Sequence, residues 1–277
     1  MITNEMVNQA IDYILKHLDQ DISIEDVADH CHFSKYYFSR VFKAETGESI
    51  YAFIKRIRME QSAIRLKLEK EKAITDIGLD YGYSPSNYSS VFKLHHQISP
   101  AEFRKSINST YVTNPFDVEK LARFQSFEEY DKKMRIQELE EMRVLYERHI
   151  GNYTDLWKNW CDFTEKYKAY FKEDTLLIER FYDDPLVSSV NQCLYDLCMT
   201  VDQECELDHV TTIARGRFVI YTFEGLVEEI FTALQGVFSV WLPGSGFEMN
   251  GGYGLDIYRA MDGENRRVVM DLCIPIK

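Results

Sequence analysis

A ten-residue motif occurs twice in the first hundred residues of this chain. The segment SKYYFSRVFK, from Ser34 to Lys43, returns fifty positions later as SPSNYSSVFK, from Ser84 to Lys93. A repeat of this kind predicts one small structural unit built twice. Each copy is typical of a short helix, a tight turn and a second helix that begins at a serine. The flanking apolar or small residues keep the same spacing in the pairs Ile24 and Ile74, Val27 and Ile77, Ala28 and Gly78, Phe33 and Tyr83, and Phe53 and Phe103.

The turn of each copy requires a residue with positive φ. Gly82 supplies it in the second copy, and His32 occupies the same place in the first copy, where histidine is one of the residue types that tolerate this conformation. Ser23 and Asp26 have the spacing of a capping box and predict the start of a helix. Ser49 predicts the start of a longer helix, to about Glu69, which at about 1.5 Å per residue is a rod of about 30 Å.

The second helix of the first copy has one apolar and one polar face. Phe38, Val41 and Phe42 form the buried stripe. An arginine on the polar face can donate two hydrogen bonds to guanine, a tyrosine can contact a thymine methyl or a phosphate, and a lysine can contact a phosphate. This pattern favours contact with double-stranded DNA over an ordinary solvated face. The polar face holds Tyr36, Ser39, Arg40 and Lys43.

The charge of the chain is divided unevenly. The net charge of −13 comes almost entirely from residues 111–277, which carry −12, whereas residues 1–110 carry −1. Within residues 35–67 the local charge is +5. We interpret this local excess as a surface that a phosphate backbone can approach.

Residues 5–107 resemble the DNA-binding domain of the AraC/XylS family of transcription regulators. The resemblance is carried by Ser34 to Lys43, by Gly82-Tyr83, by Phe92-Lys93 and by the segment SPAEFR from Ser99 to Arg104. The resemblance implies RNA polymerase as a partner. It also implies weaker DNA binding by the second copy, for two reasons. The second copy has one residue fewer than is usual between Gly82 and Phe92, and it has a serine at 90, where Arg or Lys is common. The resemblance implies DNA contacts at Tyr36, Ser39, Arg40, Lys43, Ser86, Asn87, Ser90 and Lys93.

The second half of the chain follows a segment, 108–134, in which the periodicity breaks and which we interpret as a linker. Beyond it, the patterns predict two similar halves of an α+β unit, each with a glycine, Gly151 or Gly225, ahead of its helix. Helices are predicted at 155–171 and 226–241. Strands are predicted at 143–149, 176–182, 192–201, 216–223, 255–259 and 267–276.

Residues 135–277 resemble a GyrI-like small-molecule-binding domain. The resemblance is carried by the segments MRV at 142–144, RHIGNY at 148–153, YDDP at 182–185, CLYDLC at 193–198, WLPGSG at 241–246, LDIY at 255–258 and IPI at 274–276. It implies an aromatic pocket with a central acid, as in relatives that bind lipophilic cations. The family usually has Glu at its acidic positions, and the shorter reach of Asp at both positions leaves the size and identity of the ligand open.

Two acids and several aromatic residues are candidates for this pocket. Asp256 shares a strand face with Tyr258, and Asp271 interrupts an apolar run. A cation gains about 0.5–2 kcal/mol on an aromatic face, and a carboxylate adds complementary charge. The alternative is that the acids face solvent and the aromatic residues belong to the core. The aromatic candidates are Tyr146, Trp157, Trp160, Tyr182, Tyr195, Tyr258 and Trp241.

These observations predict two domains: an all-α double helix-turn-helix at 1–107 and, after the linker 108–134, a duplicated α+β GyrI-like domain at 135–277. The expected function is transcription regulation in response to a small, cationic or aromatic effector. The alternatives are a small-molecule hydrolase and a protein-interaction module. We expect no catalytic residue, metal or cofactor, since the histidine pairs lack ligand spacing. We also expect buried free thiols, with Cys193 and Cys198 on opposite faces of one strand. No membrane span is expected, and the expected location is cytoplasmic.

Overall fold

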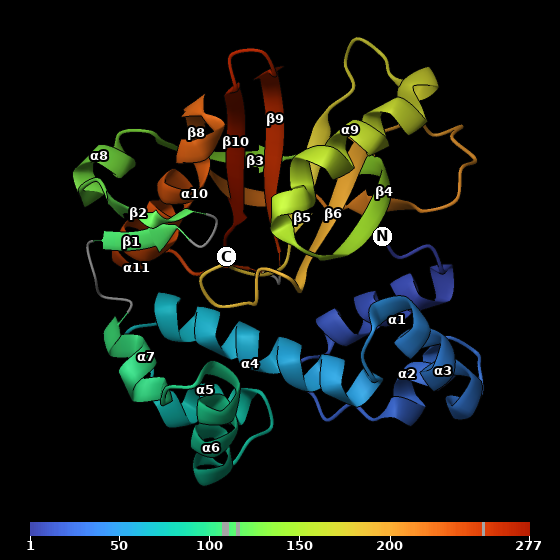
Figure 1. Cartoon of the computed structure of the whole chain (residues 1–277), viewed down its shortest axis with the longest axis vertical. Coiled ribbons are helices and arrows are strands. Elements are labelled where there is room, and N and C mark those ends of the chain that lie inside the picture. Colours follow the sequence, from blue (N-terminus) through green and yellow to red (C-terminus); the bar gives the residue numbers. More distant parts are fainter. Residues whose placement is uncertain (107–110, 115–116, 251–252) are drawn as a thin grey trace. The chain divides into compact units, whose positions relative to one another are not determined.

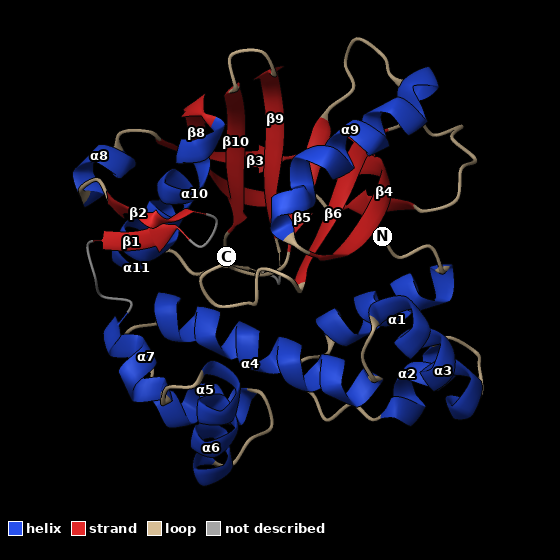
Figure 2. Ribbon diagram, viewed as in Figure 1, coloured by secondary structure: helices blue, strands red, loops and turns tan. Residues whose placement is uncertain are grey.

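The computed structural model describes residues 1–106, 111–114, 117–250 and 253–277. It divides into two compact units, one formed by Met1–Asn108 with Leu186–Ser188 and the other by Ser109–Pro185 with Ser189–Lys277. Figure 2 shows that the first unit is helical and that the second combines strands with helices. The predicted fold class of an all-α domain followed by an α+β domain is therefore confirmed.

The first unit repeats its helices with the fifty-residue spacing of the sequence. The pair α2 (Ile24–His30) and α3 (Lys35–Thr46) recurs as α5 (Ile74–Asp80) and α6 (Pro85–His96). Helix α1 (Glu5–Lys16) precedes the first pair, and α7 (Pro100–Ser106) follows the second. The long helix α4 (Ile50–Leu68) joins the two, and Figure 1 shows α3 and α6 near its opposite ends.

The turns between the paired helices have the predicted conformation. His32 has a φ of 61° and Gly82 a φ of 77°. Ser23 and Asp26 form the predicted capping box, and the side chain of Ser49 accepts a hydrogen bond from the backbone of Ala52. Ser34 and Ser84 occupy the N-cap positions of α3 and α6, but neither side chain makes a capping hydrogen bond.

Each copy buries an equivalent pair of aromatic side chains. Phe42 of α3 meets Phe53 of α4 edge to face at 5.4 Å, and Phe92 of α6 meets Phe103 of α7 in the same way at 5.6 Å. The repeat therefore preserves the packing of the unit as well as its helices.

Gly78 allows the close crossing of α5 and α6. A Cβ atom at this position would lie 2.7 Å from Cγ of Tyr88, closer than side chains pack. Gly→Ala in a helix usually adds up to about 1 kcal/mol of stability. We expect Gly78→Ala instead to lower the free energy of unfolding of the first unit by about 1–3 kcal/mol, because the ring is fully buried and cannot retreat.

Urea unfolding followed by helical circular dichroism measures this effect. The exposed neighbour Leu79→Ala is the control and should change stability little. Stabilisation of the protein by Gly78→Ala would contradict the proposed crossing.

The second unit is organised around an eight-stranded sheet with the order β3-β8-β10-β9-β5-β6-β4-β7. All neighbouring strands in it pair antiparallel. Its strands are β3 (Met134–Leu139), β4 (Met142–Gly151), β5 (Leu177–Phe181), β6 (Cys193–Thr200), β7 (Val210–Ile213), β8 (Gly216–Leu226), β9 (Gly254–Asp262) and β10 (Arg267–Pro275). Its helices are α9 (Leu156–Tyr167) and α10 (Val227–Gly236), of which the second continues as a π-helical turn (Val237–Trp241) and α11 (Leu242–Ser245).

The topology confirms the predicted duplication. One half has the order strand, helix, strand, strand as β4-α9-β5-β6, and the other repeats it as β8-α10-β9-β10. In both halves the last strand lies between the other two, so the halves meet where β5 pairs with β9. Figure 1 shows α9 over the first half and α10 beside the second. The centre of the sheet is therefore the junction of two related halves.

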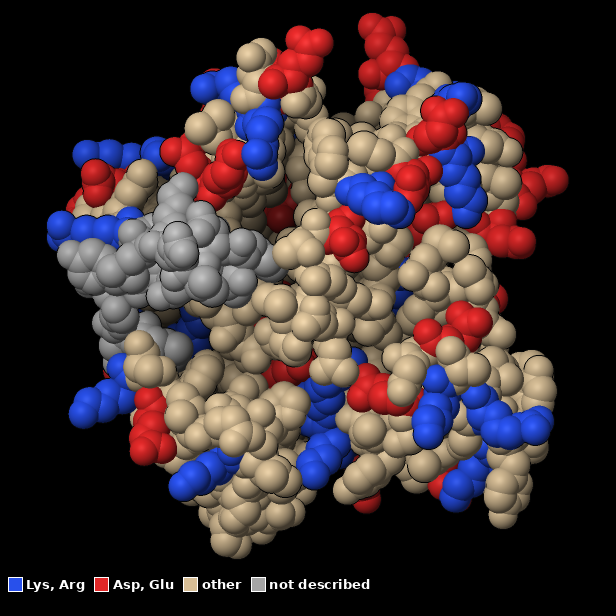
Figure 3. Space-filling view, viewed as in Figure 1, with Lys and Arg blue, Asp and Glu red and all other residues tan. Residues whose placement is uncertain are grey.

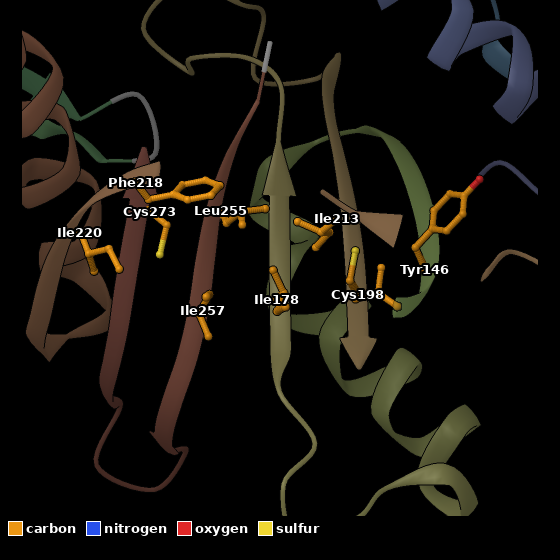
Figure 4. Close-up of a cluster of buried hydrophobic side chains, with 10 residues drawn as sticks. Tyr146, Ile178, Cys198, Ile213, Phe218, Ile220, Leu255, Ile257 and Cys273 are labelled. Atoms are coloured by element: carbon orange, nitrogen blue, oxygen red, sulfur yellow. The ribbon is translucent and has the colours of Figure 1, made fainter. Parts of the chain in front are cut away.

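The strands bury both faces of this sheet. Figure 4 shows one core, in which Ile178 and Cys198 meet Ile257 and Cys273. Strands β7 and β8 lie toward opposite ends of the strand order, yet Ile213 of β7 and Phe218 of β8 belong to the same core. The sheet is therefore strongly curled. The other face packs on α9 through Trp160, Phe163, Tyr195, Leu197 and Met199.

The segment expected to be a linker has more structure than the sequence indicates. Within 108–134 the chain forms a hairpin of β1 (Tyr111–Asn114) and β2 (Asp117–Arg123) and a short helix, α8 (Phe127–Asp131). Ser126 and Glu129 cap α8 with a capping box. Trp241 donates a hydrogen bond to Asp131 at 2.9 Å, which ties α8 to the sheet domain. Strands β3 and β7 were also missed, because both are short strands at the ends of the sheet.

Candidate functional site

The polar faces of α3 and α6 are open to solvent. The side chain of Tyr36 is 85% exposed. Ser39 is half-buried, and the other seven residues with predicted DNA contacts, Tyr36, Arg40, Lys43, Ser86, Asn87, Ser90 and Lys93, are exposed. Ser90 donates a hydrogen bond to the backbone carbonyl of Ser86 at 3.1 Å, so its hydroxyl is partly occupied by its own helix. Helix α6 spans 12 residues, as α3 does, and the missing residue therefore does not shorten it.

The basic surface is smaller than the local charge of +5 indicates. Arg56 is buried between Glu48, at 2.6 Å, and Glu60, at 3.1 Å. Arg58 donates hydrogen bonds to the backbone carbonyls of Leu18 and Gln20, just after α1, and Arg65 pairs with Glu69. These arginines hold the helices together. On α3, Lys35 pairs with Glu25, whereas Arg40 and Lys43 are exposed and can reach a phosphate or a base.

Two buried carboxylates face each other at the junction of the two halves of the sheet. Glu179 of β5 and Asp256 of β9 are direct cross-strand partners, so their side chains lie on the same face. Their residues are 1% and 3% exposed. Their neighbours Ile178 and Ile257 point into the core on the opposite face (Figure 4), so the two acids lie on the face that carries α9.

Tyrosine hydroxyls donate hydrogen bonds to one acid of this pair but not to the other. Tyr153 and Tyr258 each donate a hydrogen bond to Glu179, the second at 3.1 Å. Oδ1 of Asp256 is buried and accepts no hydrogen bond. Burial raises the pKa of Glu179 to about 7, although the two hydroxyls act in the opposite direction. Burial, and then the charge of Glu179, raises the pKa of Asp256 well above its ordinary value.

Aromatic rings surround this acid pair. Trp160 of α9 meets Tyr258 edge to face at 5.3 Å, and Tyr153 meets Tyr195 at 5.3 Å. Farther along β5, Phe181 lies over Gly254 and meets Phe238 at 6.2 Å. Figure 3 shows this side of the sheet domain hollowed, with acidic atoms deep in the hollow. The arrangement can place a flat cation against rings and above a carboxylate.

The structure divides the predicted ligand residues between the two faces of the sheet. Tyr195 and Tyr258 lie with Asp256 on the face that carries α9. Trp157 of α9 is 54% exposed and lies beside the turn between β9 and β10, where Gly263 approaches its ring. Tyr146, Tyr182 and Asp271 lie on the opposite face.

Asp271 is engaged by two arginines on that opposite face. Arg135 contacts it at 2.8 Å and Arg259 at 2.9 Å, and Thr222 donates a hydrogen bond to it at 2.6 Å. Burial alone would raise the pKa of Asp271, but these hydrogen bonds hold it below its ordinary value. Its negative charge is therefore already balanced within the protein.

Tyr146 and Tyr182 belong to a second charged cluster on the same face. Asp196 receives hydrogen bonds from Arg148 at 2.7 Å, Arg180 at 2.5 Å and Tyr182 at 2.7 Å. The two guanidinium groups lie over the rings of Tyr146 and Tyr182 at 5.5–5.6 Å. These tyrosines pack against arginines of the protein itself, so we assign them to the structure of the domain.

Sequence reasoning missed the acid that the structure places at the centre. Glu179 follows the apolar run Leu176-Leu177-Ile178 in a predicted strand, which is the same signal that selected Asp271. Tyr153 lies in the segment at 148–153 that carries the resemblance, but the sequence does not indicate its hydrogen bond to Glu179. A carboxylate inside an apolar strand was therefore a usable signal, and only pairing with β9 distinguishes Glu179 from Asp271.

Three further expectations concern metals, thiols and membranes. Across the described ranges, no group of three or more His, Cys, Asp or Glu is placed to hold a metal ion. All six cysteines are free; four are buried, but Cys161 is exposed, contrary to the expectation of buried thiols. Cys193 and Cys198 belong to cores on opposite faces of the sheet, as predicted. Among the described helices, none is long and apolar enough to span a membrane.

Two family models match the chain. One, described as a GyrI-like small molecule binding domain, covers residues 132–277, and the other, a helix-turn-helix domain, covers residues 27–106. The two matches fall on the sheet domain and on the repeated helices respectively.

Several bacterial regulators are similar to the helical part of the chain. The regulatory protein SoxS of Salmonella typhimurium is 30% identical over 38% of this chain and 97% of its own length. The regulatory protein PocR of the same species is 37% identical over 37% of this chain, and the transcriptional regulator Rob is 37% identical over 32%. The chain spans only about a third of PocR and Rob, at 34% and 31% of their lengths.

Proposed function

We propose that this chain, which belongs to the GyrI-like small-molecule-binding family and is an AraC-type DNA-binding transcription regulator, controls transcription in response to a small aromatic cation. The effector would bind in the sheet domain over Glu179 and Asp256. The helical domain would bind double-stranded DNA through α3 and α6, and a regulator of this kind would act on RNA polymerase in the bacterial cytoplasm.

The observation that carries the effector proposal is the buried acid pair. A buried carboxylate costs several kcal/mol unless a positive charge or a proton balances it. Among the described residues, neither Glu179 nor Asp256 has an ion-pair partner, and rings stand on both sides of them. A positively charged aromatic ligand would supply the missing charge and stack on these rings.

Thermal denaturation of the whole protein with a panel of aromatic cations and their neutral analogues tests this proposal. We expect selected cations to raise the melting temperature of the sheet domain, because a ligand that binds only the folded state stabilises it. All three tryptophans, Trp157, Trp160 and Trp241, lie in that domain, so their fluorescence reports on it. Equal stabilisation by neutral analogues would contradict a cation site.

DNA recognition should depend on α3 more than on α6. We expect Arg40→Ala to weaken binding to a preferred site by about 1–3 kcal/mol and to relax the preference there, because a guanidinium can read guanine. Ser90→Ala, at the equivalent position of α6, should have a smaller effect, because its hydroxyl already donates to Ser86.

Binding assays on a selected DNA site and on random DNA, over a range of salt concentrations, measure both changes. Lys43→Ala is the contrasting variant, since loss of a phosphate contact weakens both DNAs alike. A greater loss of specific binding in Ser90→Ala than in Arg40→Ala would reverse the assignment.

A further inference from the structure

The pair Glu179 and Asp256 differs from the other buried carboxylates on the strands of the sheet. Glu147 pairs with Lys166 at 2.5 Å, Asp196 with two arginines, and Asp271 with two more. Within the described ranges, no lysine, arginine or histidine pairs with Glu179 or Asp256. Arginine or lysine side chains of the protein therefore balance the other buried acids on the strands, but not the pair at the junction of β5 and β9.

The groups that face the pair from the neighbouring elements carry no positive charge. The 3₁₀ turn Tyr153–Asp155 contributes Tyr153, β9 contributes Tyr258, and α9 contributes Trp160. On the adjacent strands, the partners in register are Leu197 of β6 and Leu272 of β10. Among the described residues, the titratable groups in direct contact with the acids are therefore the two tyrosine hydroxyls. Tyr195, His149 and the pair of Glu147 with Lys166 lie on the same face, farther along β4 and β6.

Two carboxylates this close together in an apolar setting do not both ionise. They share one proton over a wide range of pH, and the protonation belongs to the pair. Because two hydroxyls donate to Glu179, its ionised form is the better stabilised, whereas Asp256 has a buried oxygen without a donor. The proton therefore resides mainly on Asp256, and the empty site carries one negative charge.

A ligand with one positive charge would need only Glu179. The second acid keeps its proton in that complex, so it adds no charge and leaves a buried oxygen without a hydrogen-bond donor. A ligand with two positive charges benefits from both acids. The ionised pair carries two negative charges that match the ligand, and Oδ1 of Asp256 gains an electrostatic partner.

We propose that the site selects a compact aromatic dication and binds it in exchange for the proton held by Glu179 and Asp256. The carboxylic acid of Asp256 loses its proton to solvent, and the resulting carboxylate and that of Glu179 together balance the two charges of the ligand. This inference rests on the proposed function, and it makes Asp256 the residue that separates dications from monocations.

The shared proton is measurable without a ligand. In the whole protein with carbon-13-labelled aspartate, the carboxyl signal of Asp256, identified from its loss in Asp256→Asn, should remain that of a protonated acid at neutral pH. In Glu179→Gln this signal should titrate at lower pH, because the like charge beside it is gone. An Asp256 carboxyl that ionises in the ordinary range of aspartate would overturn the shared proton.

The exchange is tested with two probes that carry no titratable proton, phenyltrimethylammonium and para-phenylenebis(trimethylammonium). Calorimetry at neutral pH in buffers of different ionisation enthalpy should find about one proton released by the dication and close to none by the monocation. The dication should bind at least about tenfold more tightly. Asp256→Asn should abolish both the release and the preference.

Glu264→Gln is the matched control, because it removes an acid from the exposed turn between β9 and β10 and should preserve both results. Equal affinities without proton release in the wild-type protein would overturn the exchange and leave the proposed cation site standing. Failure of both cations to bind would instead count against the cation site itself.

Discussion

Asp196→Asn is expected to remove about 3–5 kcal/mol from the free energy of unfolding of the sheet domain. The side chains of Asp196 and Arg148 are 0% exposed and that of Arg180 is 7% exposed, so neither guanidinium can turn to water when the carboxylate is lost. The substitution preserves the shape of the side chain and removes its charge. Two arginines would remain buried side by side without a counter-charge.

Urea unfolding followed by tryptophan fluorescence measures this loss. The control is Asp271→Asn on the same face of the sheet, where Arg135 and Arg259 are about two-fifths exposed and can be solvated. Its cost should be about 1 kcal/mol or less. Equal losses in the two variants would contradict the distinction between a closed and a solvated cluster.

The same cluster has a defined dependence on pH. Burial alone would raise the pKa of Asp196, but Arg148 and Arg180 hold it at about 2. A carboxyl group whose pKa is lower in the folded state contributes stability above its unfolded pKa and loses it as the pH falls. The difference in stability between wild type and Asp196→Asn should therefore be constant near neutrality and shrink between pH values of about 4 and 2.

The sequence was sufficient for the helical domain because its information is local and is given twice. The positive φ of His32 follows from the place of Gly82 in the second copy, and the capping box of Ser23 and Asp26 depends on residues three apart. The exposed faces of α3 and α6 follow from helical spacing. The local charge overestimates the basic surface, because it counts Arg56, which is buried against Glu48 by tertiary contacts that the sequence does not show.

The effector site was less accessible to sequence reasoning because it depends on which strands are neighbours. Glu179 and Asp271 both interrupt apolar strands, and alternation alone does not say which face of the sheet each one occupies. The pairing of β5 with β9 brings Glu179 opposite Asp256, whereas the register of β10 with β8 brings Asp271 beside Thr222. A pairing between segments more than seventy residues apart has no local signal.

Glu179→Gln is expected to weaken the binding of phenyltrimethylammonium by about 2–4 kcal/mol, which is about 30-fold to 1000-fold. The substitution keeps the size of the side chain and removes the ionised form that Tyr153 and Tyr258 stabilise. Binding of tert-butylbenzene, the neutral analogue of the same shape, should change little, since only the charge-dependent part of the affinity is lost. Calorimetry and competition measurements on the whole protein give both values.

Two measurements distinguish a loss of ligand binding in Glu179→Gln from a loss of folded structure. The melting temperature of Glu179→Gln should be at least that of the wild type at neutral pH, because burial raises the pKa of Glu179 and its charge is costly in the empty protein. Asp271→Asn should leave the affinity for the cation unchanged, because Asp271 lies on the other face and already pairs with two arginines. A loss of affinity in Asp271→Asn as large as that in Glu179→Gln would place the cation on the wrong face of the sheet and refute the site.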